Sequence, residues 1–252
     1  MIKIIMSGCN GKMGQVITRL VKERENYKIV CGFDIANTMN NDYPVYNNPN
    51  DFKGEADVII DFSHPDSLEK LIPFATANNI PAVIATTGLS RTQISYLKEA
   101  AKKIPIFFSA NMSLGVNLLI DIVSKAAKVL EDSFDIEIIE KHHNQKIDAP
   151  SGTALAIADA ISSSLSNTKE YVYDRHSVRK KRGKNEIGIH AVRGGTIVGE
   201  HTVIFAGNDE IIEFKHTAMS KEIFAVGALK AAEFLIHQKP GMYNMKDLVS
   251  SL

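Results

Sequence analysis

The sequence predicts an α/β fold in two parts: a parallel sheet flanked by helices, and an α+β part built on an open mixed sheet. The first half alternates short apolar strands with amphipathic helices, the order that produces a parallel sheet covered on both faces. The second half contains closely spaced strands joined by glycine-containing turns, which indicates an antiparallel or mixed sheet. The 252 residues, 44% hydrophobic and 23% charged, suit one large or two modest globular domains.

The first part is predicted to contain five strands separated by helices. Short runs rich in valine and isoleucine predict strands at residues 2–6, 27–33, 57–62, 81–85 and 105–108. The spacing of apolar residues predicts helices over 14–23 and 91–102, and residues 63–67 resemble the start of another helix.

The second part begins with a helix predicted over residues 116–130. A strand over 134–139 follows, and a polar loop then leads into a helix over 154–165. Further strands are predicted over 187–192, 196–205 and 210–216, and a last helix over 221–237.

Composition and charge exclude several classes of protein. The 29 basic residues balance 29 acidic residues, so we expect no nucleic-acid partner. No apolar run approaches the roughly 20 residues that cross a bilayer, so we expect no membrane contact. Only Cys9 and Cys31 occur, which fits a cytoplasmic protein. Without a CxxC or HExxH motif, we expect no metal site.

A glycine-rich turn directly follows the first predicted strand. Gly8, Gly11 and Gly14 have GxxGxxG spacing, and the turn leads into the first helix. Glycines let the backbone approach a pyrophosphate, whose charge then faces the start of that helix. Asp34 ends the second strand, where an acid can bind both hydroxyls of an adenosine ribose. The spacing also fits a tight turn without a ligand, but the order of strand, turn, helix and acid favours a dinucleotide site.

The same region bears on which nicotinamide cofactor is used. The carboxylate of Asp34 repels a 2′-phosphate, and the next residue is Ile35 rather than an arginine. Lys12, within the turn, still offers a cation to the phosphate of NADPH. We therefore expect both cofactors to be used, with a preference for NADH.

The polar loop after the 134–139 strand concentrates groups that transfer protons. His142 and His143 point to opposite sides of an extended chain, so we expect separate tasks rather than joint binding of a metal. Lys146 adds a positive charge or, if burial lowers its pKa, a proton donor.

The same loop ends at a predicted helix start that suits an anion. Ser151 is expected to cap the helix, which leaves the amides of Gly152 and Thr153 as free donors for a carboxylate. The alternative is a surface loop with satisfied polar groups, but the convergence of donors favours a functional site. For the basic run at residues 179–184, a solvated loop is favoured over a phosphate or nucleic-acid patch.

These residues resemble those of the 4-hydroxy-tetrahydrodipicolinate (dihydrodipicolinate) reductase family. Its most specific pattern, Glu-x-His-His-x-x-Lys-x-Asp-Ala-Pro-Ser-Gly-Thr-Ala, matches residues 140–154. The resemblance covers essentially the whole chain, with further matches at residues 8–14, 61–63, 86–88, 109–113 and 195–202.

The resemblance implies an enzyme that uses NADH or NADPH to reduce 4-hydroxy-tetrahydrodipicolinate to tetrahydrodipicolinate with loss of water, in the diaminopimelate route of lysine biosynthesis. It implies a Rossmann-type dinucleotide-binding domain, residues 1–113 and 220–252. A substrate-binding and tetramerisation domain, residues 114–219, is inserted into it. The expected partners are a small dicarboxylate substrate and further copies of the chain in a homotetramer.

The resemblance also implies roles for individual residues. His142 would be the acid/base and Lys146 the second proton donor. The implied substrate contacts are His143, Ser151, Gly152, Thr153 and Thr87. The implied cofactor contacts are Gly8, Cys9, Asn10, Gly11, Lys12, Met13, Asp34, Ala85, Thr86, Thr87, Ser109, Ala110, Asn111 and Met112.

Three positions depart from the family pattern. Ala85 stands where glycine is common, Met112 where phenylalanine is common and Lys221 where arginine is common. Ala85 would affect the packing beside the nicotinamide, and Met112 would affect a ring contact with the cofactor. Lys221 would not make the bidentate contact that an arginine side chain can make. Two other functions fit the glycine turn: a different two-domain dehydrogenase, acting on an amino-acid semialdehyde or aspartate, and a non-enzymatic nucleotide sensor. Neither requires the aligned proton donors of the loop.

Overall fold

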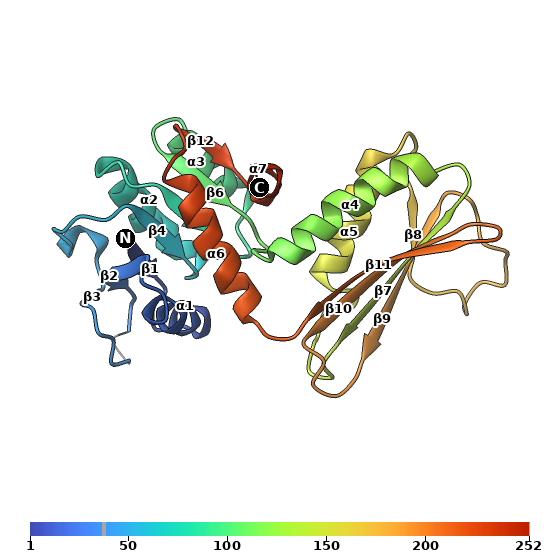
Figure 1. Cartoon of the computed structure of the whole chain (residues 1–252), viewed down its shortest axis with the longest axis horizontal. Helices are drawn as coiled ribbons and strands as arrows, with labels where there is room; N and C mark the ends of the chain where they lie inside the picture. Colours follow the sequence, from blue (N-terminus) through green and yellow to red (C-terminus); the bar gives the residue numbers. More distant parts are fainter. Residues whose placement is uncertain (37–38, 252) are drawn as a thin grey trace. The chain divides into compact units, whose positions relative to one another are not determined.

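The chain forms two compact units, each with its own sheet (Figure 1). The computed structural model describes residues 1–36 and 39–251. Unit 1 comprises Met1–Leu114 and Glu222–Leu252, and unit 2 comprises Gly115–Lys221. Leu252, the last residue of the predicted dinucleotide-binding domain, lies outside the described residues. Unit 2 therefore interrupts unit 1 in the sequence.

Unit 1 is built on a seven-stranded sheet in which every neighbouring pair of strands is parallel. The strand order is β12-β6-β5-β4-β1-β2-β3. The strands are β1 (Ile2–Ser7), β2 (Tyr27–Phe33), β3 (Val45–Tyr46), β4 (Val58–Asp61), β5 (Ala82–Ile84), β6 (Pro105–Phe108) and β12 (Gly241–Tyr243). The five predicted strands and the parallel sheet are confirmed, whereas β3 and β12 were not predicted.

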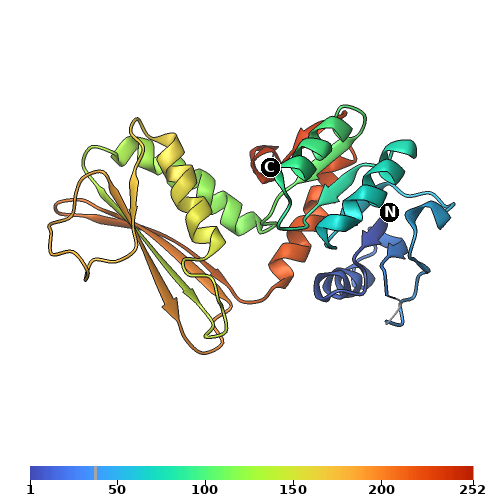
Figure 2. The same cartoon turned by 180° about the vertical axis from the view of Figure 1, so that it is seen from behind.

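Helices cover both faces of this sheet. They are α1 (Lys12–Lys22), α2 (Leu68–Ala77), α3 (Arg91–Ala100), α6 (Glu222–Leu235) and α7 (Met245–Ser251), with short 3-10 turns at Pro49–Asp51 and Pro65–Ser67. Helices α1, α6 and α7 share one apolar cluster with the sheet, and α2 and α3 share the other (Figures 1 and 2). Consecutive residues of β4 are fully buried because both faces are covered.

Unit 2 is built on a five-stranded mixed sheet in the order β11-β10-β7-β9-β8. Its strands are β7 (Asp135–His142), β8 (Glu170–Val172), β9 (Glu186–Arg193), β10 (Gly199–Ala206) and β11 (Ile211–Ala218). β7 runs parallel to β9 and antiparallel to β10, which confirms the mixed sheet. The predicted end of β7 at residue 139 is wrong: the strand continues to His142, because ladder pairing with β9 and β10 extends that far.

Helices α4 (Leu114–Leu130) and α5 (Gly152–Ser164) cover one face of the mixed sheet (Figure 1). Alternate residues of β7 face these helices, beginning with the buried side chains of Ile136 and Ile138. Glu140 and His142 continue the same alternation and are also buried. The apolar core therefore gives way to ionisable groups at the end of β7, beside the start of α5.

Candidate functional site

The glycine-rich turn of unit 1 has the backbone shape of a phosphate-binding turn. Gly8 has a φ of 75°, and a Cβ there would lie 2.7 Å from the carbonyl oxygen of Phe62. A Cβ on Gly14 would lie 2.2 Å from the carbonyl oxygen of Gly8. Gly11 is the N-cap of α1, has no side chain to cap the first amides, and precedes a first turn without acidic residues. This arrangement fits the pyrophosphate of a dinucleotide.

Asp34 lies beside this turn, directly after β2. Its Oδ2 accepts the backbone N–H of Asn10 at 2.9 Å, and its Oδ1 accepts that of Ala36 at 3.2 Å. A carboxylate offers about four acceptor sites, so Asp34 retains capacity for ribose hydroxyls. Lys12, in the glycine-rich turn, and Ile35, the residue after Asp34, are both exposed.

The remaining candidate cofactor residues follow β5 and β6, at the same carboxyl edge of the parallel sheet. The Thr86 hydroxyl donates to Oδ2 of Asp61 at 2.6 Å, and the Ser109 hydroxyl donates to the carbonyl oxygen of Asn111 at 2.8 Å. Asp61 is fully buried, and this burial raises its pKa. Both hydroxyls therefore donate to groups of the protein and hold the two loops in place. Thr87 and Ala110 are exposed at the same edge.

Besides Thr86, three apolar candidate cofactor residues have buried side chains. Cys9, Ala85 and Met112 are exposed by 0%, 5% and 2% and belong to the apolar core. A Cβ on Gly227 of α6 would lie 1.7 Å from the carbonyl oxygen of Met112, which shows how closely this segment packs against the helix. The side chain of Met112 is therefore packed in the core of unit 1, and its contact with a cofactor stays a prediction.

In unit 2, a fully buried carboxylate organises the histidine at the end of β7. Nδ1 of His142 lies 2.6 Å from Oε2 of Glu140. Glu140 also accepts the backbone N–H of Ser151 at 2.9 Å and both terminal nitrogens of Arg193 at 2.7 Å. Burial by itself would raise the pKa of Glu140, but its contacts with Arg193, His142 and Ser151 outweigh burial and hold the pKa below 4.5. Glu140 is therefore ionised at neutral pH.

A second histidine lies against the first. The rings of His201 and His142 meet edge to face with centroids 5.2 Å apart, and Nε2 of His201 lies 3.0 Å from the hydroxyl of Ser151. Burial lowers the pKa of His201 to about 4, so His201 is neutral at physiological pH. A Cβ on Gly199 would lie 3.1 Å from Nε2 of His142, so this glycine keeps space open beside that nitrogen.

The start of α5 is capped as the sequence predicted. The Ser151 hydroxyl accepts the backbone N–H of Ala154 at 3.2 Å and is buried. The same hydroxyl therefore both caps α5 and contacts His201. Gly152 is exposed and Thr153 is half-buried.

An internal carboxylate occupies the anion-binding groups of the loop. Nζ of Lys146 lies 2.8 Å from Oδ1 of Asp148, which lowers the pKa of Asp148, and the backbone of Gly152 contributes to the same shift. Asp148 would therefore compete with a substrate carboxylate for Lys146 and for the Gly152 amide, whose role as an anion donor stays a prediction. Asp148 stands only two residues after Lys146, and this short spacing is the local signal for the internal ion pair.

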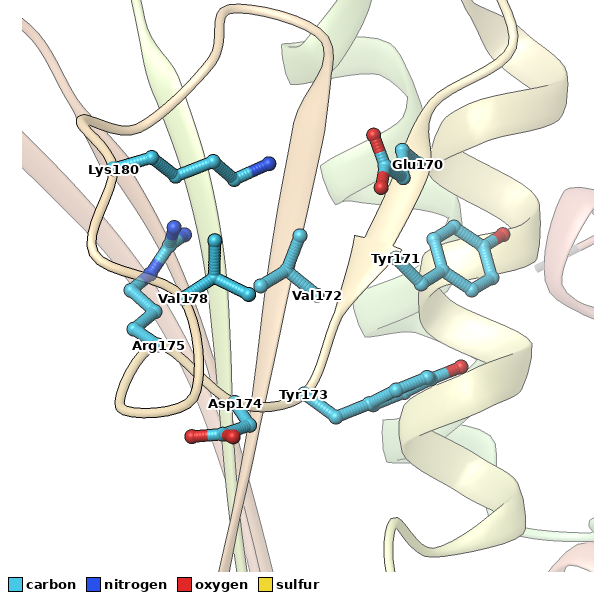
Figure 3. A pocket seen from close by; sticks show the side chains of 8 residues that line it. All are labelled: Glu170, Tyr171, Val172, Tyr173, Asp174, Arg175, Val178 and Lys180. Carbon is cyan, nitrogen blue, oxygen red and sulfur yellow. The ribbon is translucent and has the colours of Figure 1, made fainter.

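The basic run at residues 179–184 is only partly solvated. Nζ of Lys180 lies 3.0 Å from Glu186, and Arg182 is largely buried in contact with Glu137. Figure 3 shows Lys180 beside a pocket of about 230 Å³ next to β8. Glu186 begins β9 whereas Arg193 ends it, so this pocket lies at the far end of the strand from His142.

Within residues 1–36 and 39–251, no three or more histidine, cysteine, aspartate or glutamate residues are grouped to hold a metal ion. None of the helices described there combines the length and apolar character needed to cross a membrane.

Family models and curated relatives match nearly the whole chain. The model for the N-terminus of dihydrodipicolinate reductase matches residues 2–112, and the model for its C-terminus matches residues 115–249. A 4-hydroxy-tetrahydrodipicolinate reductase of Caldanaerobacter subterraneus subsp. tengcongensis is 59% identical over 249 residues, covering 99% of this chain and 98% of the relative. The enzyme of that name from Clostridium tetani is 51% identical, covering 100% of this chain and 98% of the relative.

Solved structures with the same fold include enzymes of different function. A dipicolinate-bound dihydrodipicolinate reductase from Paenisporosarcina sp. TG-14 matches with a TM-score of 0.85 and 26% identity, covering 98% of this chain and 99% of that one. An aspartate dehydrogenase from Thermotoga maritima matches with a TM-score of 0.53 and 12% identity, covering 95% of this chain and 98% of that one. The second likeness concerns the fold alone.

Proposed function

The chain belongs to the dihydrodipicolinate reductase family, and from that premise we propose how its residues carry out the family reaction. The protein is an oxidoreductase that uses NAD(P)H to reduce 4-hydroxy-tetrahydrodipicolinate to tetrahydrodipicolinate with loss of water, in the diaminopimelate route to lysine. One observation carries the assignment of its proton donors. His142 ends β7, and the backbone N–H of Lys146 donates to the carbonyl oxygen of His143 at 3.2 Å, so both proposed donors lie at the same end of the mixed sheet.

Unit 1 is proposed to hold the cofactor. The backbone of residues 8–13 would bind the pyrophosphate, Asp34 the adenosine ribose, and residues 85–87 and 109–112 the nicotinamide half. Bound NAD(P)H supplies the hydride. A preference for NADH is supported by the half-buried carboxylate of Asp34, because it would lie beside the 2′-position and repel a phosphate there. Lys12 is exposed and gives NADPH a weaker alternative contact.

Unit 2 is proposed to bind the dicarboxylate substrate. Lys146 and the amides of Gly152 and Thr153 would receive one carboxylate, which would take the place of Asp148. His143 is half-buried on the same loop and is proposed as a further substrate contact. Support for this ligand class comes from the relative that was solved with dipicolinate bound.

His142 is proposed to supply the proton that the reaction needs. Hydride addition at C4 of the unsaturated imine leaves an electron-rich enamine, and the imidazole of His142 would protonate it, with Lys146 as the second donor. The fixed charge of Lys146 would also orient the substrate, because positioning of reacting groups lowers the barrier.

Assembly and cellular location are also proposed. We infer a homotetramer formed through unit 2, supported by β11, an edge strand on which Ile211 is 66% exposed. A cytoplasmic location is supported by Cys9 and Cys31, which are free, buried thiols. Light scattering after size-exclusion chromatography would test the assembly.

The site assignment is tested with the purified enzyme, the product of the preceding synthase, and nicotinamide absorbance as the readout. Replacing His142 with alanine should lower kcat by about 10²- to 10⁴-fold, because a positioned acid or base contributes that much. The Kd for NADH should stay close to wild type, because His142 lies in unit 2. Wild-type turnover in His142→Ala would exclude the proposed role.

Measurement of kcat/KM with NADH and NADPH under matched conditions would test the cofactor preference.

A further inference from the structure

Glu140 is a fully buried group at the end of β7 that the proposed reaction does not use. Its carboxylate has no exposed surface, yet it contacts three separate parts of unit 2. These are the His142 ring on its own strand, the backbone of Ser151 at the start of α5, and the Arg193 guanidinium at the end of β9. Removing a charge from water costs free energy, so a buried carboxylate needs ionic and hydrogen-bonding partners, and Glu140 has both.

The contacts of Glu140 determine which nitrogen of His142 carries a hydrogen. An ionised carboxylate only accepts hydrogen bonds, so Nδ1 of His142 must donate at 2.6 Å. A neutral His142 is then protonated on Nδ1, and Nε2 is the nitrogen that gains and loses a proton. The space that Gly199 leaves beside Nε2 agrees with this assignment.

Arg193 holds this carboxylate in place, and its positive charge balances the negative charge of Glu140. It donates to both oxygens of Glu140, and its Nη2 also donates to the carbonyl oxygen of Asp148 at 2.7 Å. Two parallel contacts of this kind fix the plane of the carboxylate. The groups that face the His142 ring are thus Glu140 on its own strand, Arg193 on β9 behind that carboxylate, and neutral His201 on β10.

We propose that Glu140, clamped by Arg193, is the positioning residue that fixes His142 in the Nδ1–H form and makes Nε2 the proton-transferring atom. The inference rests on the proposed role of His142 and adds to it the reacting atom and the residues that select it. Comparable groups behind a catalytic or ligating histidine typically cost about 10- to 100-fold in function when they are removed.

The decisive variant is Glu140→Gln, because it keeps the size of the side chain. The Ser151 amide and both Arg193 nitrogens can only donate, so the imidazole is the single partner able to accept a hydrogen bond from the new amide group. His142 should therefore change to the Nε2–H form. We expect kcat to fall by about 10- to 100-fold, with little change in the Kd for NADH.

The tautomer is measured directly by long-range ¹H–¹⁵N correlation spectra of the full-length protein labelled with ¹⁵N-histidine. The His142 signals are assigned by their loss in His142→Ala. Wild-type protein should show Nδ1–H, and Glu140→Gln should show Nε2–H. A merely structural role for Glu140 would lower the stability of the variant without exchanging these signals.

A second variant, Gly199→Ala, tests the reacting atom without disturbing the buried carboxylate. Its Cβ would lie 3.1 Å from Nε2, so turnover should fall while the Nδ1–H signal is kept. If Glu140→Gln does not fold, the wild-type tautomer and Gly199→Ala decide the question. An Nε2–H form in wild type, or wild-type kcat in either variant, would overturn the inference. Full activity of His142→Ala would instead overturn the proposed function itself.

Discussion

The two units present their candidate residues in opposite ways. In unit 1 the side chains of Cys9, Ala85 and Met112 are buried in the core, and the turn owes its shape to glycines that have no room for a Cβ. In unit 2 the candidates are ionisable side chains whose positions depend on buried hydrogen bonds, centred on Glu140. Unit 1 should therefore be sensitive to added atoms, whereas unit 2 should be sensitive to changes of charge that add no atoms.

The largest expected effect in unit 1 comes from Gly14→Ala. The added Cβ would lie 2.2 Å from the carbonyl oxygen of Gly8, so the turn must shift. We expect a loss of about 1–3 kcal/mol in the free energy of unfolding, typical of overpacking, together with weaker NADH binding. Urea denaturation and fluorescence titration with NADH measure the two effects.

Gly11→Ala is the matched control for the shape argument. Its Cβ would lie 3.3 Å from the same oxygen, a contact that a small shift relieves. Its stability should stay within about 1 kcal/mol of wild type, the usual size of N-cap effects. A marked loss of NADH affinity in this stable variant would show that the cofactor itself approaches Gly11. Equal stability losses in both variants would contradict the packing argument.

Acid should act on the two units with opposite signs. His201 has a folded pKa of about 4 against an ordinary value of 6.5, so between these values the unfolded chain binds more protons than the folded chain. Unit 2 should therefore lose stability as the pH falls from 6.5 to 4, by at most about 1.4 kcal/mol per pH unit from this group. Asp61 in unit 1 has a raised pKa, so its contribution to stability is instead lost as the pH rises.

Hydrogen exchange resolved by unit, at neutral pH and near pH 5, would measure this difference. Glu140 and Glu186 should reinforce it at lower pH, because both have lowered pKa values and their contributions are lost as the pH falls through them. His201→Gln should make unit 2 less sensitive to acid between pH 6.5 and 4. An unchanged pH dependence in that variant would show that His201 is not the responsible group.

The smallest expected effect concerns the internal ion pair of the loop. Asp148→Asn keeps the shape but removes the charge that competes for Lys146. We expect the KM for substrate to fall by about two- to fivefold, since a partly exposed ion pair contributes about 0.2–1 kcal/mol. Lys146→Ala should change KM in the opposite direction. A higher KM for Asp148→Asn would mean that Asp148 assists binding instead of competing with it.

The sequence predicted the elements whose periodicity extends over several residues. The strands at residues 2–6 and 27–33 were found for that reason. The equally short β5 lies within the apolar run 81–85, whereas β3, β8 and β12 have two or three residues and no such run around them. The two-residue alternation that buries Ile136 and Ile138 also places Glu140 and His142 on one face, so the role of Glu140 had a local signal that was not used.

The rest of the site had no such signal. Arg193 lies 53 residues from Glu140 in sequence, and only the pairing of β7 with β9 brings the two together. The contact between His201 and Ser151 likewise depends on the register of β10 against β7. Local pattern therefore indicates which groups are chemically suited to a task, and tertiary register determines which of them are positioned to perform it.

The late position of α6 in the sequence has a consequence for biosynthesis. This helix supplies Ala225, Ala228 and Leu229 to the core of the parallel sheet, but it is translated after all of unit 2. During elongation, the first 114 residues leave the ribosome without the helix that covers much of that face. Unit 2 has its complete set of strands by then and can fold first, as domains do during synthesis. The apolar face of the nascent parallel sheet therefore stays uncovered until its last helices have been translated.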